Sequence, residues 1–165
     1  MQRRASQSNL PSFIADSMLG DVARWLRLLG FDCLYDSSLN DDQLLEIACS
    51  QRRVLLTRDR GLHRRALAEG ALSILVNSID VARALRQISK ELQLCLVFDE
   101  MRSRCPSCNS PLKIVSREEV AGKVPEGILT RYSKFWVCSN ERCSKVYWIG
   151  SHWRTIRKVL SSLKS

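Results

Sequence analysis

Long hydrophobic runs are absent from this chain of 165 residues, and no charged and apolar leader opens it. Without a stretch of about 18 apolar residues, no segment is long enough to span a bilayer, and without a leader the sequence does not predict export. Acidic residues are also few, at 17 against 26 lysines and arginines. We therefore expect a cytoplasmic protein that has no membrane partner.

Cysteine is present but odd in number, with seven residues, which argues against a secreted disulfide scaffold. Four of the cysteines form two pairs, Cys105-Pro-Ser-Cys108 and Cys138-Ser-Asn-Glu-Arg-Cys143. Two such pairs about thirty residues apart are typical of a structural zinc site, because a tetrahedral ion takes two thiolates from each pair. We expect zinc on these four ligands. A redox-active dithiol and a chance clustering of buried cysteines are the alternatives.

The excess positive charge is confined to one part of the chain. Residues 1–100 hold 13 basic and 13 acidic residues, whereas residues 101–165 hold 13 and 4, so the whole net charge of +9 lies in the second part. Clustered lysines and arginines favour a polyanionic partner through counterion release, and nucleic acid fits best. A basic surface that only confers solubility is the alternative.

Short apolar runs alternate with helical patterns through the first hundred residues. We expect strands at residues 13–15, 33–35, 53–57 and 72–76, each followed by a helix. Strands that read as short continuous apolar runs favour an α/β fold, in which a mostly parallel sheet carries helices on both faces. The chain is long enough for one such core and a small appendage.

Three acidic residues lie at the ends of these elements. Asp16 closes the first strand, Asp41 begins the second helix and Asp59 follows the third strand. Because the carboxyl ends of parallel strands meet at one edge of a sheet, we expect these acids to converge and to hold Mg²⁺ or Mn²⁺. Such a site suits phosphodiester hydrolysis. The alternative for each acid is a helix cap.

Arginines surround the three acids. Arg24 and Arg27 lie on the first helix, and Arg58 and Arg60 flank the third acid, Asp59. Their guanidinium groups are expected to clamp the nucleic-acid backbone beside the metal. If they pair with the acids instead, no metal site is left and this half of the chain is a binding surface rather than a catalyst.

The last part of the chain mixes aromatic and basic residues. Ser151 is expected to cap a final helix whose apolar stripe docks on the first domain and whose cations face solvent or RNA. The expected RNA contacts at this helix are His152, Trp153, Arg154, Arg157 and Lys158. For His152 the alternative is a packed, hydrogen-bonded side chain.

Several motifs, in this order along the chain, resemble the Mut7-C domain family over about residues 13–160. They are Phe13-Ile14-Ala15-Asp16, Ala23-Arg24-Trp25-Leu26-Arg27-Leu28-Leu29-Gly30, Leu55-Leu56-Thr57-Arg58-Asp59, Arg104-Cys105-Pro106-Ser107-Cys108-Asn109 and Tyr147-Trp148-Ile149-Gly150-Ser151-His152-Trp153. The family occurs as small stand-alone prokaryotic proteins, which this chain resembles, and as a domain that follows the exoribonuclease domain of animal mut-7 proteins.

The resemblance implies a PIN-like ribonuclease fold with an attached zinc ribbon, and RNA as the ligand. The resemblance also implies that Asp16, Asp41 and Asp59 are the acidic residues of the site. PIN-like sites commonly use a fourth acid, for which Asp80 and Asp42 are the candidates in this sequence.

Four parts are expected along the chain: a flexible basic tail at residues 1–12, a PIN-like α/β domain at 13–100, a zinc ribbon at 101–150 with a loop at 120–131, and an amphipathic helix at 151–165. The leading hypothesis is an RNA-directed, divalent-metal-dependent ribonuclease that uses no nucleotide cofactor and whose basic zinc ribbon holds single-stranded or structured RNA. One alternative is a non-catalytic RNA-binding module that assists another nuclease. The other is a protein-interaction domain whose basic surface meets an acidic protein.

Overall fold

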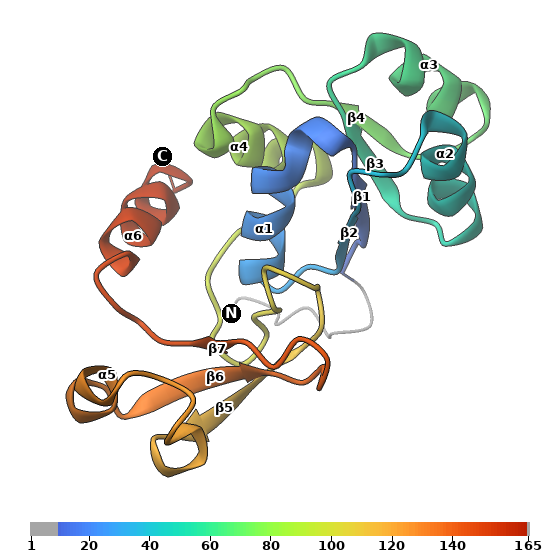
Figure 1. Cartoon of the computed structure of the whole chain (residues 1–165). Coiled ribbons are helices and arrows are strands. Elements are labelled where there is room, and N and C mark those ends of the chain that lie inside the picture. Colours follow the sequence, from blue (N-terminus) through green and yellow to red (C-terminus); the bar gives the residue numbers. More distant parts are fainter. Residues whose placement is uncertain (1–9, 165) are drawn as a thin grey trace.

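A computed structural model describes residues 10–164, so residues 1–9 of the expected tail lie outside the described residues. Two sheets make up this part of the chain (Figure 1). The first is parallel and has four strands, and the second is antiparallel and has three. Over residues 10–164, no helix has the length and apolar character needed to cross a membrane.

The parallel sheet has the strand order β2-β1-β3-β4. Its strands are β1 (Phe13–Ala15), β2 (Cys33–Tyr35), β3 (Val54–Thr57) and β4 (Ser73–Leu75). Strand β1 is one of the two inner strands. Its residue Ala15 lies opposite Tyr35 of β2 and opposite Leu56 of β3. The four strands that the apolar runs predict are therefore all present.

Helices cover both faces of this sheet, as Figure 1 shows. They are the short η2 (Ser17–Leu19), α1 (Gly20–Leu28), α2 (Asp41–Ser50), α3 (Arg60–Ala68) and α4 (Val81–Leu92). Phe13 and Ala15 belong to a buried cluster with α1 and α4, whereas Ile14 belongs to a second cluster with α2 and α3. Alternate residues of one strand thus fill two separate cores. The predicted α/β fold with helices on both faces is confirmed.

The second sheet, here called the ribbon, follows an irregular segment that starts after α4. Its strands are β5 (Leu112–Ser116), β6 (Lys134–Cys138) and β7 (Val146–Tyr147). The connection from β5 to β6 contains η3 (Glu118–Val120) and α5 (Glu126–Arg131), so the expectation of a plain loop at 120–131 is wrong. Pro125 stands at the N-cap of α5, where proline costs no hydrogen bond, and Val120 is fully buried.

The last helix, α6 (Trp153–Ser162), returns to the α/β part of the chain. Its residues Val159, Leu160 and Leu163 pack against the core cluster of α1 and α4, as the apolar stripe predicted. The N-cap position is His152 and makes no side-chain cap bond, so the expected cap at Ser151 is not formed.

The end of α1 lies very close to the segment that leads into the ribbon. Gly30 has a φ of +91°, and a Cβ at this position would lie 2.9 Å from the carbonyl oxygen of Arg102. Only glycine combines the left-handed turn with this approach. The sequence signal that ends the first helix is therefore also what lets the two parts of the molecule meet.

Candidate metal centre and acidic edge

Four cysteines from two distant segments meet at one end of the ribbon. The Sγ atoms of Cys105, Cys108, Cys138 and Cys143 all lie within 4.8 Å of one another. Cys108 and Cys138 are 3.3 Å apart and Cys105 and Cys143 are 3.8 Å apart, while a tetrahedral zinc ion with Zn–S bonds near 2.3 Å separates its sulfurs by about 3.8 Å. This all-sulfur donor set fits a structural zinc ion.

Two of these thiols, Cys108 and Cys138, differ in pKa. Burial raises the pKa of Cys108, but hydrogen bonds from Ser110 and from Cys138 outweigh burial and bring the pKa of Cys108 down to about 6. Burial raises the pKa of Cys138 to about 12. A zinc ion stabilises all four as thiolates and takes the place of their protons.

The first cysteine pair is also bonded to the α/β part. Arg27 is 5% exposed, and its Nε donates to the carbonyl oxygen of Cys33 and its Nη1 to that of Pro106, both at 2.8 Å. Asn109 accepts from the Cys33 amide at 3.1 Å and donates to Asp32 at 2.7 Å. We call these five residues the junction. Because its guanidinium is buried and bonded, Arg27 is removed from the expected RNA contacts.

At the carboxyl edge of the parallel sheet, the residues that end or follow three neighbouring strands lie side by side. The register of Ala15 with Tyr35 and Leu56 places Asp16 between Asp36, directly after β2, and Thr57, the last residue of β3. Thr57 Oγ1 donates to Asp16 Oδ2 at 2.8 Å and accepts from the backbone nitrogen of Asp59 at 3.0 Å. Thr57 therefore links Asp16 to Asp59. We call these four residues the acidic edge.

Asp36 is the member that sequence reasoning missed. Asp36 is exposed. It directly follows the last residue of β2, just as Asp16 directly follows the last residue of β1. The signal was therefore present in the sequence. The hydroxyl and the amide of Ser38 both donate to Asp36 Oδ1, at 2.6 and 2.9 Å, and these bonds lower the pKa of Asp36.

Two of the predicted acids also serve as caps, which was the alternative for each. Asp16 Oδ1 accepts from the Ser17 amide at 2.6 Å, and Asp59 Oδ1 accepts from the Leu62 amide at 2.9 Å. A cap uses one carboxylate oxygen, and a carboxylate has two. Capping therefore fixes the direction of each side chain and does not by itself preclude binding of a cation.

The other predicted acids stand apart from the acidic edge. Asp41 is exposed in the first turn of α2, and the cap of that helix is Asn40. Asp42 pairs with Arg65 at 2.5 Å, and Asp80 caps α4. Within residues 10–164, the four cysteines are the only set of three or more possible ligand residues whose ligand atoms lie within 4.8 Å of one another. Asp16, Asp41 and Asp59 thus form no closed carboxylate cage.

Magnesium does not require such a cage. It keeps several of its waters and is usually bound through one or two carboxylates together with phosphate oxygens of the substrate. The carboxylates of the acidic edge are hard oxygen donors of the kind that Mg²⁺ and Mn²⁺ prefer. The donor set therefore fits an ion that arrives with a phosphodiester.

The remaining arginines near the edge form no ion pair with Asp16 or Asp59 in the described part of the chain. Arg24 is exposed and bonds to Asp21 at 2.6 Å, and Arg60 is exposed at the start of α3 beside the half-buried Arg58. The alternative in which arginines occupy the acids is thus not realised at these two positions.

The predicted contacts of the last helix lie on or near its surface. The exposed members are His152, Arg154, Arg157 and Lys158. Trp153 is half-buried and meets Phe98 edge to face, with 4.7 Å between the ring centroids. Phe135 and Trp136 of β6 are buried and act as structural residues of the ribbon.

Comparison with known proteins gives one match. The sequence model of the Mut7-C RNAse domain covers residues 11–160, which is nearly the whole chain. No curated protein and no solved structure matches the chain. The match includes both the acidic edge and the four cysteines, so one family unit contains both.

Proposed function

Given that the chain belongs to the Mut7-C RNAse domain family, we propose that it is an RNA-directed ribonuclease that depends on a divalent metal ion. The observation that carries the proposal is the bridge from Asp16 through Thr57 to Asp59, with Asp36 beside it. This bridge lies at the carboxyl edge of a parallel sheet, where α/β proteins place their functional sites. We propose accordingly that the α/β part of the chain is a PIN-like nuclease domain.

Each residue of the acidic edge has a part in the proposed reaction. Asp16, Asp36 and Asp59 would hold Mg²⁺ or Mn²⁺, with Asp41 as an outer acid at the start of α2. When bound, the ion lowers the pKa of a water and neutralises charge on the scissile phosphate. Thr57 orients the carboxylate of Asp16 through its hydroxyl. Asp36 takes the place of the fourth acid.

The substrate would be held by basic residues on both parts of the molecule. In this proposal residues 13–100 carry the chemistry, and the ribbon and α6 bind the RNA backbone. Helix α6 has exposed cations and no acidic residue in its sequence. The exposed cations that would hold the RNA backbone are Arg24 and Arg60 on the α/β part and Arg154, Arg157 and Lys158 on α6.

The test is cleavage of end-labelled single-stranded and hairpin RNA in Mg²⁺, Mn²⁺ or chelator. Asp16→Asn and Asp36→Asn are each compared with Glu126→Gln, which changes an exposed acid on α5. We expect metal-dependent cleavage that falls at least about 100-fold in the first two variants and is unchanged in the third. Cleavage retained by Asp16→Asn would remove Asp16 from the mechanism.

A second candidate is an RNA-binding module without chemistry. The cap bonds of Asp16 and Asp59 favour it, because they give both acids a structural role that needs no metal. In that case RNA binds tightly, no condition yields cleavage, and Asp16→Asn leaves the affinity unchanged. A parallel binding measurement on the same proteins separates the two candidates.

A further inference from the structure

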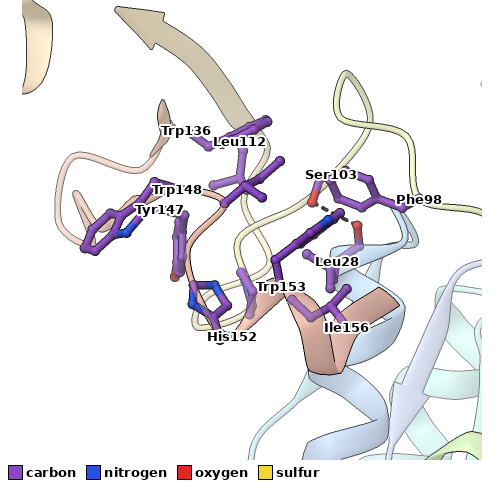
Figure 2. Close-up of a pocket in the computed structure, with 12 residues that line it drawn as sticks. Leu28, Phe98, Ser103, Leu112, Trp136, Tyr147, Trp148, His152, Trp153 and Ile156 are labelled. Atoms are coloured by element: carbon purple, nitrogen blue, oxygen red, sulfur yellow. Dashed lines mark hydrogen bonds between the residues drawn. The ribbon is translucent and has the colours of Figure 1, made fainter. Parts of the chain in front are cut away.

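A cavity of about 240 Å³ lies where the ribbon and α6 meet the end of α1, away from the acidic edge (Figure 2). One wall comes from the ribbon and its exit, with the rings of Tyr147 and Trp148. The opposite wall comes from the α/β part and α6, with Leu28, Phe98, Trp153 and Ile156. Its surface is therefore almost entirely aromatic or aliphatic.

The rings of this cavity are held in place by their other contacts. The hydroxyl oxygen of Tyr147 lies 3.2 Å from Cys105 Sγ, and Trp148 packs edge to face on Phe135 with 6.4 Å between centroids. Trp153 is fixed against Phe98. Tyr147, Trp148 and Trp153 are all only half-buried. Preformed rings with open surface are what a flat ligand needs for stacking.

The surroundings of the cavity are basic. His152 is exposed and lines the cavity, and the helix that begins next to it presents Arg154, Arg157 and Lys158 to solvent. Helix α6 has no acidic residue to neutralise them. The ligand that matches apolar rings beside a row of cations is a flat apolar group on an anionic chain.

We propose that this cavity receives one unstacked nucleobase of single-stranded RNA, while the adjoining phosphates lie on the cations of α6. The proposal rests on RNA being the ligand, as in the proposed function, and adds a second site. Aromatic walls with few polar groups bind any base whose ring face is free to stack, and they do not distinguish one base from another. A duplex keeps its bases stacked, so the cavity favours single strands.

The position of the cavity relates it to the acidic edge. Asp16 caps η2, which leads directly into α1, and Leu28 is the last residue of α1. Nine helical residues span about 14 Å. A base in the cavity would therefore anchor the RNA at the end of α1 that is farther from Asp16.

The experiment measures binding by fluorescence anisotropy in the Asp16→Asn background, in which RNA stays intact. The probes are a labelled octauridine and the same oligomer with abasic nucleotides in place of the uridines. The variant Ile156→Trp fills the cavity without removing a charge. Its control is Ile114→Trp, which places the same ring at an exposed position of β5 outside the cavity.

We expect the abasic oligomer to bind about tenfold or more weakly than octauridine, in the range that stacking of one base produces. Ile156→Trp should bind octauridine as weakly as the abasic oligomer, and Ile114→Trp should bind it normally. Circular dichroism and zinc content check that both variants fold. If folded Ile156→Trp binds octauridine as the parent does, the base is not bound in this cavity; if that variant does not fold, equal affinity for the two oligomers still overturns the base site.

Equal affinity for the two oligomers would overturn the base site and leave the ribonuclease proposal to the cleavage assay. A cavity that serves a protein side chain or a second copy of this chain gives that same result. If the Asp16→Asn protein binds neither oligomer, both the base site and RNA as the ligand are overturned.

Discussion

The Nη1 of Arg27 donates a hydrogen bond of 2.8 Å to the carbonyl oxygen of Pro106, a residue between the first two cysteines of the metal centre. Burial lowers the pKa of Arg27, yet an arginine stays charged in proteins. A buried cation must be matched by acceptors, and Arg27 finds them in Pro106 and Cys33. Helix α1 therefore fixes the orientation of the metal centre.

Arg27→Met should lower the free energy of unfolding by about 2–3 kcal/mol, because the buried carbonyl of Cys33 and the half-buried carbonyl of Pro106 lose a charged donor. Arg24→Met is the matched control on the same helix, since Arg24 is exposed and bonds to the exposed Asp21. Arg24→Met should lower the free energy of unfolding by about 0.5 kcal/mol or less. Urea unfolding measures both. Equal losses for the two variants would contradict the buried role of Arg27.

Removal of the metal ligands should unfold the ribbon. In Cys105→Ser we expect loss of zinc and of ribbon structure, because a structural zinc ion contributes on the order of 10 kcal/mol to the folding of such a site. Cys49→Ser, at an exposed cysteine of α2, is the control and should keep its zinc. Zinc is measured by atomic absorption and structure by circular dichroism. A Cys105→Ser protein that melts like the parent would refute the zinc assignment.

Much of the fold follows from local pattern in the sequence. The strands Phe13–Ala15 and Val54–Thr57 could be predicted because a parallel strand buried on both faces reads as an unbroken apolar run. The helix at Glu126–Arg131 was missed because Gly127 and Pro125 suggest a loop. Proline is tolerated at a helix start, and a six-residue helix gives too little periodicity to detect.

The candidate site was harder to predict because it depends on contacts between distant segments. By its spacing Arg27 is predicted to be a surface cation, but its guanidinium is buried against the carbonyls of Cys33 and of Pro106, and Pro106 is 79 residues away in the sequence. Asp36 could have been predicted, since it follows β2 directly, whereas the predicted acid, Asp41, lies at the start of the next helix. That Thr57 joins Asp16 to Asp59 follows from side-chain directions that no pattern encodes.

Thr57→Val tests the bridge of the acidic edge. Valine keeps the shape of this fully buried side chain but removes the hydroxyl that donates to Asp16 and accepts from Asp59. We expect the unfolding free energy to fall by about 1–3 kcal/mol and any cleavage to fall about tenfold or more. Thr57→Ser retains the hydroxyl and should restore cleavage. If Thr57→Val cleaves RNA at the parental rate, the bridge does not orient Asp16.

The reactivity of Cys33 should respond to pH differently from that of the exposed cysteines. Burial raises the pKa of Cys33 to about 12, so at pH 9 only about one thiol in a thousand is the nucleophilic thiolate. In the native protein iodoacetamide should therefore modify the exposed Cys49 and Cys95 and leave Cys33 unmodified, both at pH 7 and at pH 9. Peptide mass spectrometry after timed alkylation measures each site, and alkylation in denaturant shows that Cys33 reacts once it is exposed.

Because the amide and carbonyl of Cys33 are both bonded in the junction, Arg27→Met should speed the native-state alkylation of Cys33 by loosening this region. Modification of Cys33 at the rate of Cys49 in the parent protein would show that the junction is open in solution.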